Sequence, residues 1–160
     1  MKIKKSGKKA LIAGGSATGG GMNFQAAVTA IAEVHVAVGA KLDWLAGIAH
    51  DVPISVLAET GGPGDDIAIQ FDDGTWAEVQ VKRGLAAGKK MWEAVIKLAK
   101  AINDGAVDYG VLVVCPNSSG TIKNDLARDL ERLAGGRSDG LKEITNTFVT
   151  KLGGGGTFSG

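Results

Sequence analysis

The chain has 160 residues and a formal net charge of +1, with 44% hydrophobic and 22% charged side chains. This length fits one globular domain that buries roughly 70% of the surface of its unfolded chain. The near-neutral charge excludes a uniformly basic surface for nucleic acid, so any such affinity must come from a local patch. The single cysteine, Cys115, excludes an internal disulfide, and its apolar neighbours indicate a buried thiol in a reducing compartment.

Residues 1–22 are predicted to form a flexible, basic and glycine-rich arm. Five lysines lie in the first nine residues, and glycine dominates positions 14–21. The apolar stretch between them, residues 10–13, is far shorter than the core of a signal peptide or a membrane span, so we expect a cytoplasmic protein with no membrane partner. No Gly-Lys-Ser or Gly-Lys-Thr follows the glycines, which argues against a P-loop.

Hydrophobic periodicity from residue 23 onwards predicts the order helix, three strands, helix, strand, helix, with a further helix at the end. Apolar residues at helical spacing mark the helices, and alternation of apolar and polar residues marks the strands. The fourth strand is apolar throughout, which is typical of a strand buried on both faces and reached by a right-handed crossover. The expected elements are helix 23–38, strands 53–59, 66–71 and 75–83, helix 89–103, strand 109–115, and helices 122–134 and 141–152.

These elements predict an α/β fold of mixed α+β type, in which a central mixed sheet of about four strands lies between helices in three layers. Residues 23–152 would form this single domain. The glycine-rich tail at 153–160 has few side chains to bury, so we expect it to act as a linker or a frayed end.

The third strand carries the most informative pattern in the chain. Glu78, Gln80 and Lys82 alternate with apolar residues, so period-2 geometry places all three on one face. Asp66 opens the preceding strand, and the glycine-containing turn 72–75 joins the two strands into a hairpin. Carboxylate and amide oxygens suit a hard cation such as Mg²⁺, and the lysine suits an attacking water or a scissile phosphate. We therefore expect a metal-dependent site on this hairpin.

Other interpretations of these residues stay open. The polar residues of the third strand could form the solvated face of a half-exposed sheet, with glutamate and lysine as cross-strand neighbours. Asp65 could replace Asp66, although Asp66 has the parity that leaves the apolar residues of its strand on the core face. His35 and His50 have no partner at zinc-binding spacing. The three tryptophans are expected to fill the core rather than to stack on bases.

The order and spacing of the motifs resemble a known group of nucleases. An acidic residue that opens a hairpin, followed on the next strand by Gln80-Val81-Lys82 and enclosed by two helices, resembles the PD-(D/E)xK superfamily. Glutamine in place of the usual acid resembles its Mrr-type branch. Residues 14–152 as a whole resemble the N-terminal endonuclease domains of bacterial antiphage effectors, such as those fused to NACHT or other STAND-type NTPase modules. The motifs that carry this wider resemblance are the glycine-rich start, 23–25, 65–67, 78–82, 90–93, 118–120 and 125–126.

The resemblance implies a restriction-endonuclease-like fold and Mg²⁺-dependent hydrolysis of phosphodiester bonds in double-stranded DNA, with Mn²⁺ able to substitute. Asp66 and Gln80 would bind the metal together with the carbonyl of Val81. Lys82 would position or activate water, and Glu78 would belong to the same catalytic set. A further ligand is expected from one of three positions: Glu33, Glu59 or Gln25.

The basic residues that follow the third strand, Arg83, Lys89 and Lys90, are expected to contact backbone phosphates without reading sequence. The resemblance also implies an oligomeric active state and a C-terminal sensor or NTPase module, fused or tethered. Two alternative functions stay open. One is a catalytically inactive nuclease fold that docks DNA or a protein, which the lack of a clear acid on the first helix favours. The other is a Holliday-junction resolvase, which uses the same metal constellation.

Overall fold

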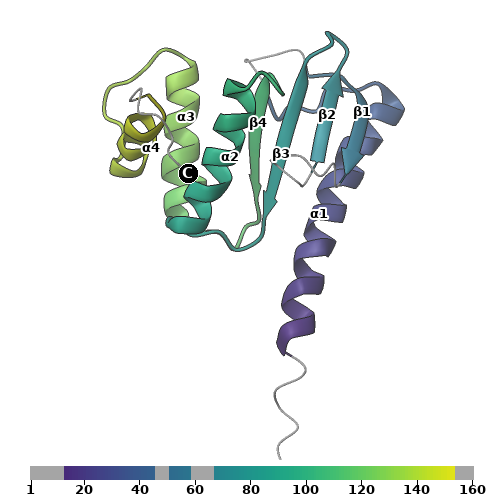
Figure 1. Ribbon diagram of the computed structural model, residues 1–160, viewed down its shortest axis with the longest axis horizontal. Coiled ribbons are helices and arrows are strands. Elements are labelled where there is room, and N and C mark those ends of the chain that lie inside the picture. The colour runs from purple at the N-terminus through teal and green to yellow at the C-terminus, as the bar shows by residue number, and fades with distance from the viewer. Residues whose placement is uncertain (1–12, 46–50, 59–66, 154–160) are drawn as a thin grey trace, which may run out of the picture.

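The structure, a computed structural model, describes residues 13–45, 51–58 and 67–153. Figure 1 shows a sheet that lies between one long helix and a group of shorter helices. The elements along the chain are α1 (Ala13–Val38), β1 (Pro53–Ala58), β2 (Ile67–Phe71), β3 (Trp76–Lys82), α2 (Lys89–Asn103), β4 (Tyr109–Val114), the π-helix η1 (Thr121–Leu126), α3 (Ala127–Ala134) and α4 (Glu143–Gly153).

The strands of the described residues form one four-stranded mixed sheet in the order β1-β2-β3-β4. β1, β2 and β3 pair antiparallel, and β4 pairs parallel with β3. Two parallel neighbours need a crossover connection, and α2 lies in the connection between β3 and β4. The predicted fold class, a mixed sheet flanked by helices in an α/β core, is confirmed.

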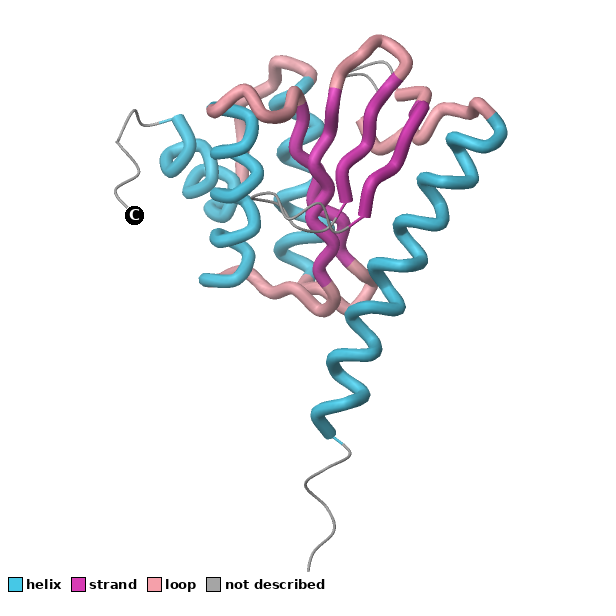
Figure 2. Tube along the Cα trace, turned by 45° about the vertical axis from the view of Figure 1, so that its right-hand side comes forward, coloured by secondary structure: helices cyan, strands magenta, loops and turns pink. Residues whose placement is uncertain are grey.

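Alternation along the strands gives the sheet two apolar faces. Val79 and Val81 of β3 pack with Val28 and Ala32 of α1 on one face. On the other face, Leu112 of β4 packs against a cluster from α2, η1 and α3. Figure 2 shows α1 on one side of the sheet and the remaining helices on the other. The central strand β3 is therefore covered from both sides. β4 lies at the edge of the four-stranded sheet and its residues are half-buried or exposed, so the prediction of a strand buried on both faces is wrong for β4.

β2 and β3 form the antiparallel hairpin that the sequence predicts. Ile67 pairs with Val79, and the strands meet in a tight turn. In the turn, Gly74 has a φ of 86°, a backbone conformation that residues with a side chain rarely adopt. The amide of Phe71 donates to the carbonyl of Thr75 at 2.9 Å and closes the hairpin.

The helix α2 approaches β4 closely at Gly110. A Cβ atom added to Gly110 would lie 3.0 Å from Cβ of Leu98 and 3.3 Å from Cδ1 of Ile102, both on α2. These distances are shorter than ordinary van der Waals contact, so the absence of a side chain allows the helix to pack on the strand. The residue paired with Gly110 on β3 is Glu78.

Two helices differ from the sequence prediction. α1 begins at Ala13, so residues 13–22, which were expected to be part of a flexible arm, are helical. Elongation of a helix adds one backbone hydrogen bond per residue once later turns have formed, and here it outweighs a glycine cost of roughly 1 kcal/mol per residue. The expected helix 122–134 is divided into η1 and α3. Within the described residues, α1 included, no helix combines the length and apolarity that a membrane span requires.

Replacing Gly110 with alanine is expected to destabilise the fold by about 1–3 kcal/mol, because the new Cβ forces α2 away from the sheet. Urea unfolding followed by circular dichroism measures the change. Gly120→Ala is the matched control, since Gly120 has a helical φ of −58° and the added Cβ would lie at an ordinary contact distance of 3.5 Å from Nδ2 of Asn124. Equal stability of the two variants would contradict the close packing at Gly110.

Candidate functional site

The three polar residues of β3 lie on one face of the sheet, as predicted. In the parallel ladder Glu78 pairs with Gly110, and Gln80 and Lys82 pair with the next two residues of the same face of β4. That face is covered by α2. The alternative in which these residues form a solvated face is therefore wrong for Glu78 and Gln80, since α2 and β4 exclude water from them.

Burial makes Glu78 and Gln80 unusual among polar residues. Glu78 is 8% exposed and Gln80 is 2% exposed. Within the described part of the chain, Nε2 of Gln80 has no hydrogen-bond partner. A buried polar group without a partner costs on the order of 1–3 kcal/mol, so such groups are rare in folded proteins and often mark a functional site. Lys82, two residues further along, is half-buried at the end of the strand.

Two of the predicted acidic residues cannot be placed in the site. Asp66 and Glu59 both lie outside the described residues. Asp66 immediately precedes Ile67 in the sequence, and Ile67 pairs with Val79, the neighbour of Gln80. In the ranges 13–45, 51–58 and 67–153, no three His, Cys, Asp or Glu residues gather closely enough to hold a metal ion. The described residues thus supply Glu78, the amide of Gln80 and the ammonium of Lys82, but no complete set of metal ligands.

The candidate residues on the first helix lie on the other side of the sheet. α1 packs through Val28 and Ala32 against the face opposite to Gln80. Glu33 is exposed and lies outside this packed face, so the structure does not bring its carboxylate together with the β3 site. Gln25 is half-buried on the same helix. The position of α1 relative to the sheet is a tertiary property that helical spacing alone does not give.

Two loops are tied together at the carboxyl ends of β3 and β4. The amide of Gly84 donates to Sγ of Cys115 at 3.1 Å, and the amide of Leu85 donates to Oγ of Ser118 at 3.0 Å. The carbonyl of Leu85 accepts from the amide of Ser119 at 2.8 Å. These bonds fix the loop that follows Lys82, and open α/β sheets commonly bind ligands at this end of their parallel strands.

Cys115 is buried, as predicted, and serves this connection. It is 6% exposed, and the amide of Gly84 lowers the pKa of its thiol below the ordinary value by donating to the sulfur. The thiol thus acts as a hydrogen-bond acceptor between the two loops.

The predicted phosphate-binding residues are exposed beside the same end of β3. Arg83 directly follows the strand, and Lys89 and Lys90 form the first turn of α2. Nζ of Lys89 lies 3.8 Å from a carboxylate oxygen of Glu93, a surface ion pair of little energetic weight. All three basic residues are therefore available to a polyanion that approaches the carboxyl end of the parallel strands.

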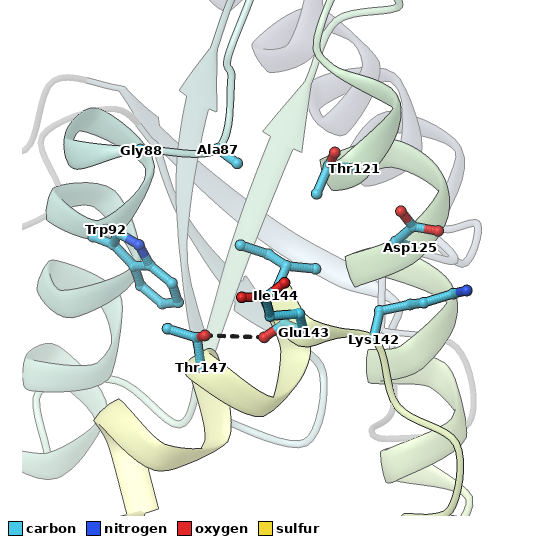
Figure 3. Close-up of a pocket in the computed structure, with 9 residues that line it drawn as sticks. All are labelled: Ala87, Gly88, Trp92, Thr121, Asp125, Lys142, Glu143, Ile144 and Thr147. Carbon is cyan, nitrogen blue, oxygen red and sulfur yellow. Dashed lines mark hydrogen bonds between the residues drawn. The ribbon is translucent and has the colours of Figure 1, made fainter.

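A cavity of about 540 Å³ lies where α2, η1 and α4 meet, and the sequence did not indicate it. Figure 3 shows the indole of Trp92 beside Ile144, with Asp125 and Lys142 on the other side. The volume is within the range of small-molecule sites. Its residues come from three helices and from the loops that precede α2 and α4, and they share no local motif that sequence reasoning could have found. The lining residues are Ala87, Gly88, Trp92, Thr121, Asp125, Lys142, Glu143, Ile144 and Thr147.

Asp129 of α3 holds α4 in place and so shapes this cavity. Its side chain is fully buried and accepts from the amide of Lys142 at 2.6 Å and from Oγ1 of Thr145 at 3.0 Å. Arg128 donates to its other oxygen at 2.7 Å. The bond from the Lys142 amide is the main cause that lowers the pKa of Asp129 from 3.8 to about 2.

Acid is expected to weaken the fold through Asp129. Because its folded-state pKa lies below the value of 3.8 in the unfolded chain, the carboxylate contributes its full stability above about pH 4, and this contribution is lost as the pH falls towards 2. Asp129→Asn should lower stability at neutral pH and flatten the loss between about pH 4 and pH 2. Urea unfolding at a series of pH values measures both effects.

Asp139→Asn is the control for that series, since Asp139 is an exposed carboxylate that pairs with Arg132 at 3.2 Å. It should leave the acid limb of the stability curve unchanged. An Asp129→Asn curve parallel to that of the unaltered chain would refute the assignment of the acid-sensitive contribution to Asp129.

No protein-family model matches this chain. Comparison with curated proteins gives no match, and neither does comparison with solved structures. The resemblance to PD-(D/E)xK nucleases therefore rests on the order and spacing of the sequence motifs, and the residues of β3 are the part of that pattern whose geometry the structure describes.

Proposed function

We propose that this protein is a metal-dependent endonuclease that hydrolyses phosphodiester bonds in double-stranded DNA. One observation carries the proposal: β3 keeps Glu78 and Gln80 buried beside the half-buried Lys82, at a cost in stability that a purely structural strand would avoid by using apolar residues. Three such groups in succession on one strand face match the motif Glu-x-Gln-x-Lys, whose oxygen and nitrogen atoms suit metal-assisted hydrolysis of a phosphate ester.

The donor atoms of β3 fit a hard divalent cation. Gln80 offers its side-chain carbonyl oxygen Oε1, and oxygen ligands are those that Mg²⁺ prefers. Asp66, Gln80 and the carbonyl of Val81 would hold Mg²⁺ or Mn²⁺, and the bound ion would polarise the scissile phosphate and lower the pKa of a water. Glu78 would fix the orientation of the residues that bind the metal, as carboxylates beside metal sites commonly do.

Lys82 would act directly on the reacting phosphate. Its ammonium lies at the exit of the buried strand, where it would stabilise negative charge that develops on the phosphate oxygens. The hydrogen bonds between the loops after β3 and β4 hold the backbone that follows this residue, so the end of the strand would need little rearrangement during the reaction. Arg83, Lys89 and Lys90 would bind the flanking phosphates and give affinity without sequence preference.

A second candidate function is a nuclease fold that binds DNA or a partner protein without cutting. The exposed position of Glu33, on a helix that packs on the opposite face of the sheet from Gln80, favours it. We infer from the motif resemblance that either form would serve as an effector domain in antiphage defence, driven by a module that brings copies together. Dependence of cleavage on a divalent metal separates the two functions.

Plasmid cleavage tests the proposed chemistry. Lys82→Met and Asp66→Ala should each reduce Mg²⁺-dependent cutting of plasmid DNA by a factor of about 10²–10³ or more, because each removes charge stabilisation or a metal ligand. EDTA should stop the reaction. Lys100→Met, an exposed lysine in the last turn of α2, is the matched control and should cut as the unaltered chain does. Metal-independent DNA binding without cleavage in any lane would instead support the inactive fold.

Gln80→Met separates a functional from a structural role. Methionine has a similar volume and no amide. The free energy of unfolding of the variant should therefore exceed that of the unaltered chain by about 1 kcal/mol or more, while metal binding and cleavage are lost. Urea unfolding and calorimetric titration with Mn²⁺ provide the two readouts. A less stable Gln80→Met protein would show that the amide supports the fold and would remove the main argument for the site.

The salt dependence of DNA binding tests the basic residues. Combined Arg83→Ala, Lys89→Ala and Lys90→Ala should reduce the slope of log K against log salt concentration by about 3, since each phosphate contact contributes roughly 0.9. The loss of affinity should be similar for unrelated sequences. Lys100→Ala serves as the control, and an unchanged slope in the triple variant would place the DNA-binding surface elsewhere.

A further inference from the structure

The helix α1 is apolar on the side that faces away from the sheet as well as on the side that packs against it. Val28 and Ala32 are buried against the sheet. On the outer side, Ile31, Val34 and Val38 are 49%, 59% and 67% exposed. A helix that is apolar all round is normally covered on all sides, so the outer side of α1 indicates a surface that another molecule covers.

The exposed apolar residues of α1 follow the spacing of a coiled-coil seam. Ala27, Ile31, Val34 and Val38 are separated by four, three and four residues, which is the a/d pattern of a heptad repeat. Ile31 and Val38 take the a positions, where β-branched residues favour parallel two-stranded pairing. The same spacing towards the N-terminus reaches Phe24, which packs against the core cluster of the sheet, so the seam begins at Ala27.

The flanks of this seam suit a second copy of the same helix. The g positions next to the seam are Ala30 and Ala37, both exposed and small enough to let another backbone approach. Glu33 is the sole Asp, Glu, Lys or Arg between positions 10 and 38 of the sequence, so two copies of α1 would meet with little charge repulsion. A partner with a strongly charged helix would find no complementary charge there.

The surroundings of α1 leave the seam accessible. In Figure 1 and Figure 2 no other described element lies against the outer side of the helix, and its N-terminal part extends past the end of the sheet. We propose that two copies of this chain pair in parallel through α1 and form a twofold symmetric dimer along the seam Ala27-Ile31-Val34-Val38. In a twofold interface the same surface of each copy contacts the other, and the seam can pair with itself in this way.

The size of the seam sets the strength of the dimer. The seam from Ala27 to Val38 covers about 18 Å of helix, and a contact strip about 10 Å wide covers about 180 Å² on each copy. The total, about 360 Å², is well below the roughly 1,200 Å² of a standard stable interface. The dimer should therefore form reversibly and should be sensitive to local concentration. The inference does not depend on the proposed chemistry of β3, which lies elsewhere on the fold.

Disulfide trapping of single-cysteine variants tests the pairing. All variants of the full chain carry Cys115→Ser, which removes the native thiol and keeps a hydrogen-bond acceptor for Gly84. In a parallel dimer the two copies of Val34→Cys face each other across the symmetry axis within disulfide reach. Under mild oxidation, this variant should form covalent dimer at least about tenfold faster than Glu33→Cys, an exposed neighbour outside the seam.

A substitution in the seam should then suppress the trapping. Ile31→Glu, or Val38→Glu as a second variant, added to Val34→Cys should slow crosslinking to the rate of Glu33→Cys, because the dimer would bury an unpaired carboxylate twice. Both sites are exposed in the monomer, and circular dichroism confirms that the fold persists. Equal crosslinking at positions 33 and 34, or crosslinking that neither glutamate slows, would overturn the parallel seam.

Discussion

Burial of β3 on both of its faces is the constraint on which the rest of the structure depends. One face lies under α1, and the other lies under α2 with β4 alongside. Both helix layers must therefore pack on the same strand, which fixes their distance from the sheet and requires Gly110 where α2 comes closest. Against this background, the polar side chains of Glu78 and Gln80 stand in a position where apolar residues would stabilise the fold better.

The low-polarity surroundings of β3 change what its polar groups can do. Coulomb interactions are stronger where water is excluded, so a charge placed among Glu78, Gln80 and Lys82 would interact more strongly with them than on the open surface. The loops at the carboxyl end of β3 add rigidity through the contacts of Gly84 and Leu85 with the loop after β4. Buried polar groups followed by exposed basic residues form a gradient from a dry interior to a basic rim.

Much of this arrangement follows from local sequence patterns. Period-2 alternation predicts the shared face of Glu78, Gln80 and Lys82. The continuous apolar run of β4 predicts a strand correctly but overstates its burial, because β4 lies at the edge of the sheet and its residues are half-buried or exposed. Tertiary contacts decide the rest. The clamp between Asp129 and the start of α4 joins residues 13 and 16 positions apart with no common motif, and the side of the sheet on which α1 packs determines that Glu33 does not meet Gln80. The glycine content of residues 14–21 predicts a flexible arm, but helix elongation extends α1 back to Ala13.

The β2–β3 turn offers a practical contrast with the loops at the opposite end of the sheet. Asp72, Asp73 and Gly74 are exposed, and the amide and hydroxyl of Thr75 bond only within the turn, to Asp73 at 2.9 and 2.6 Å. The amide of Asp72 bonds to the carbonyl of Val52 at 3.0 Å, so inserted sequence is best placed after Asp73, at the exposed tip of the turn, where insertions are tolerated. A fluorescent or affinity tag placed there would report on the domain without disturbing its core, whereas the same tag between β3 and α2 would break the bonds to Cys115 and Ser118 that join the two loops.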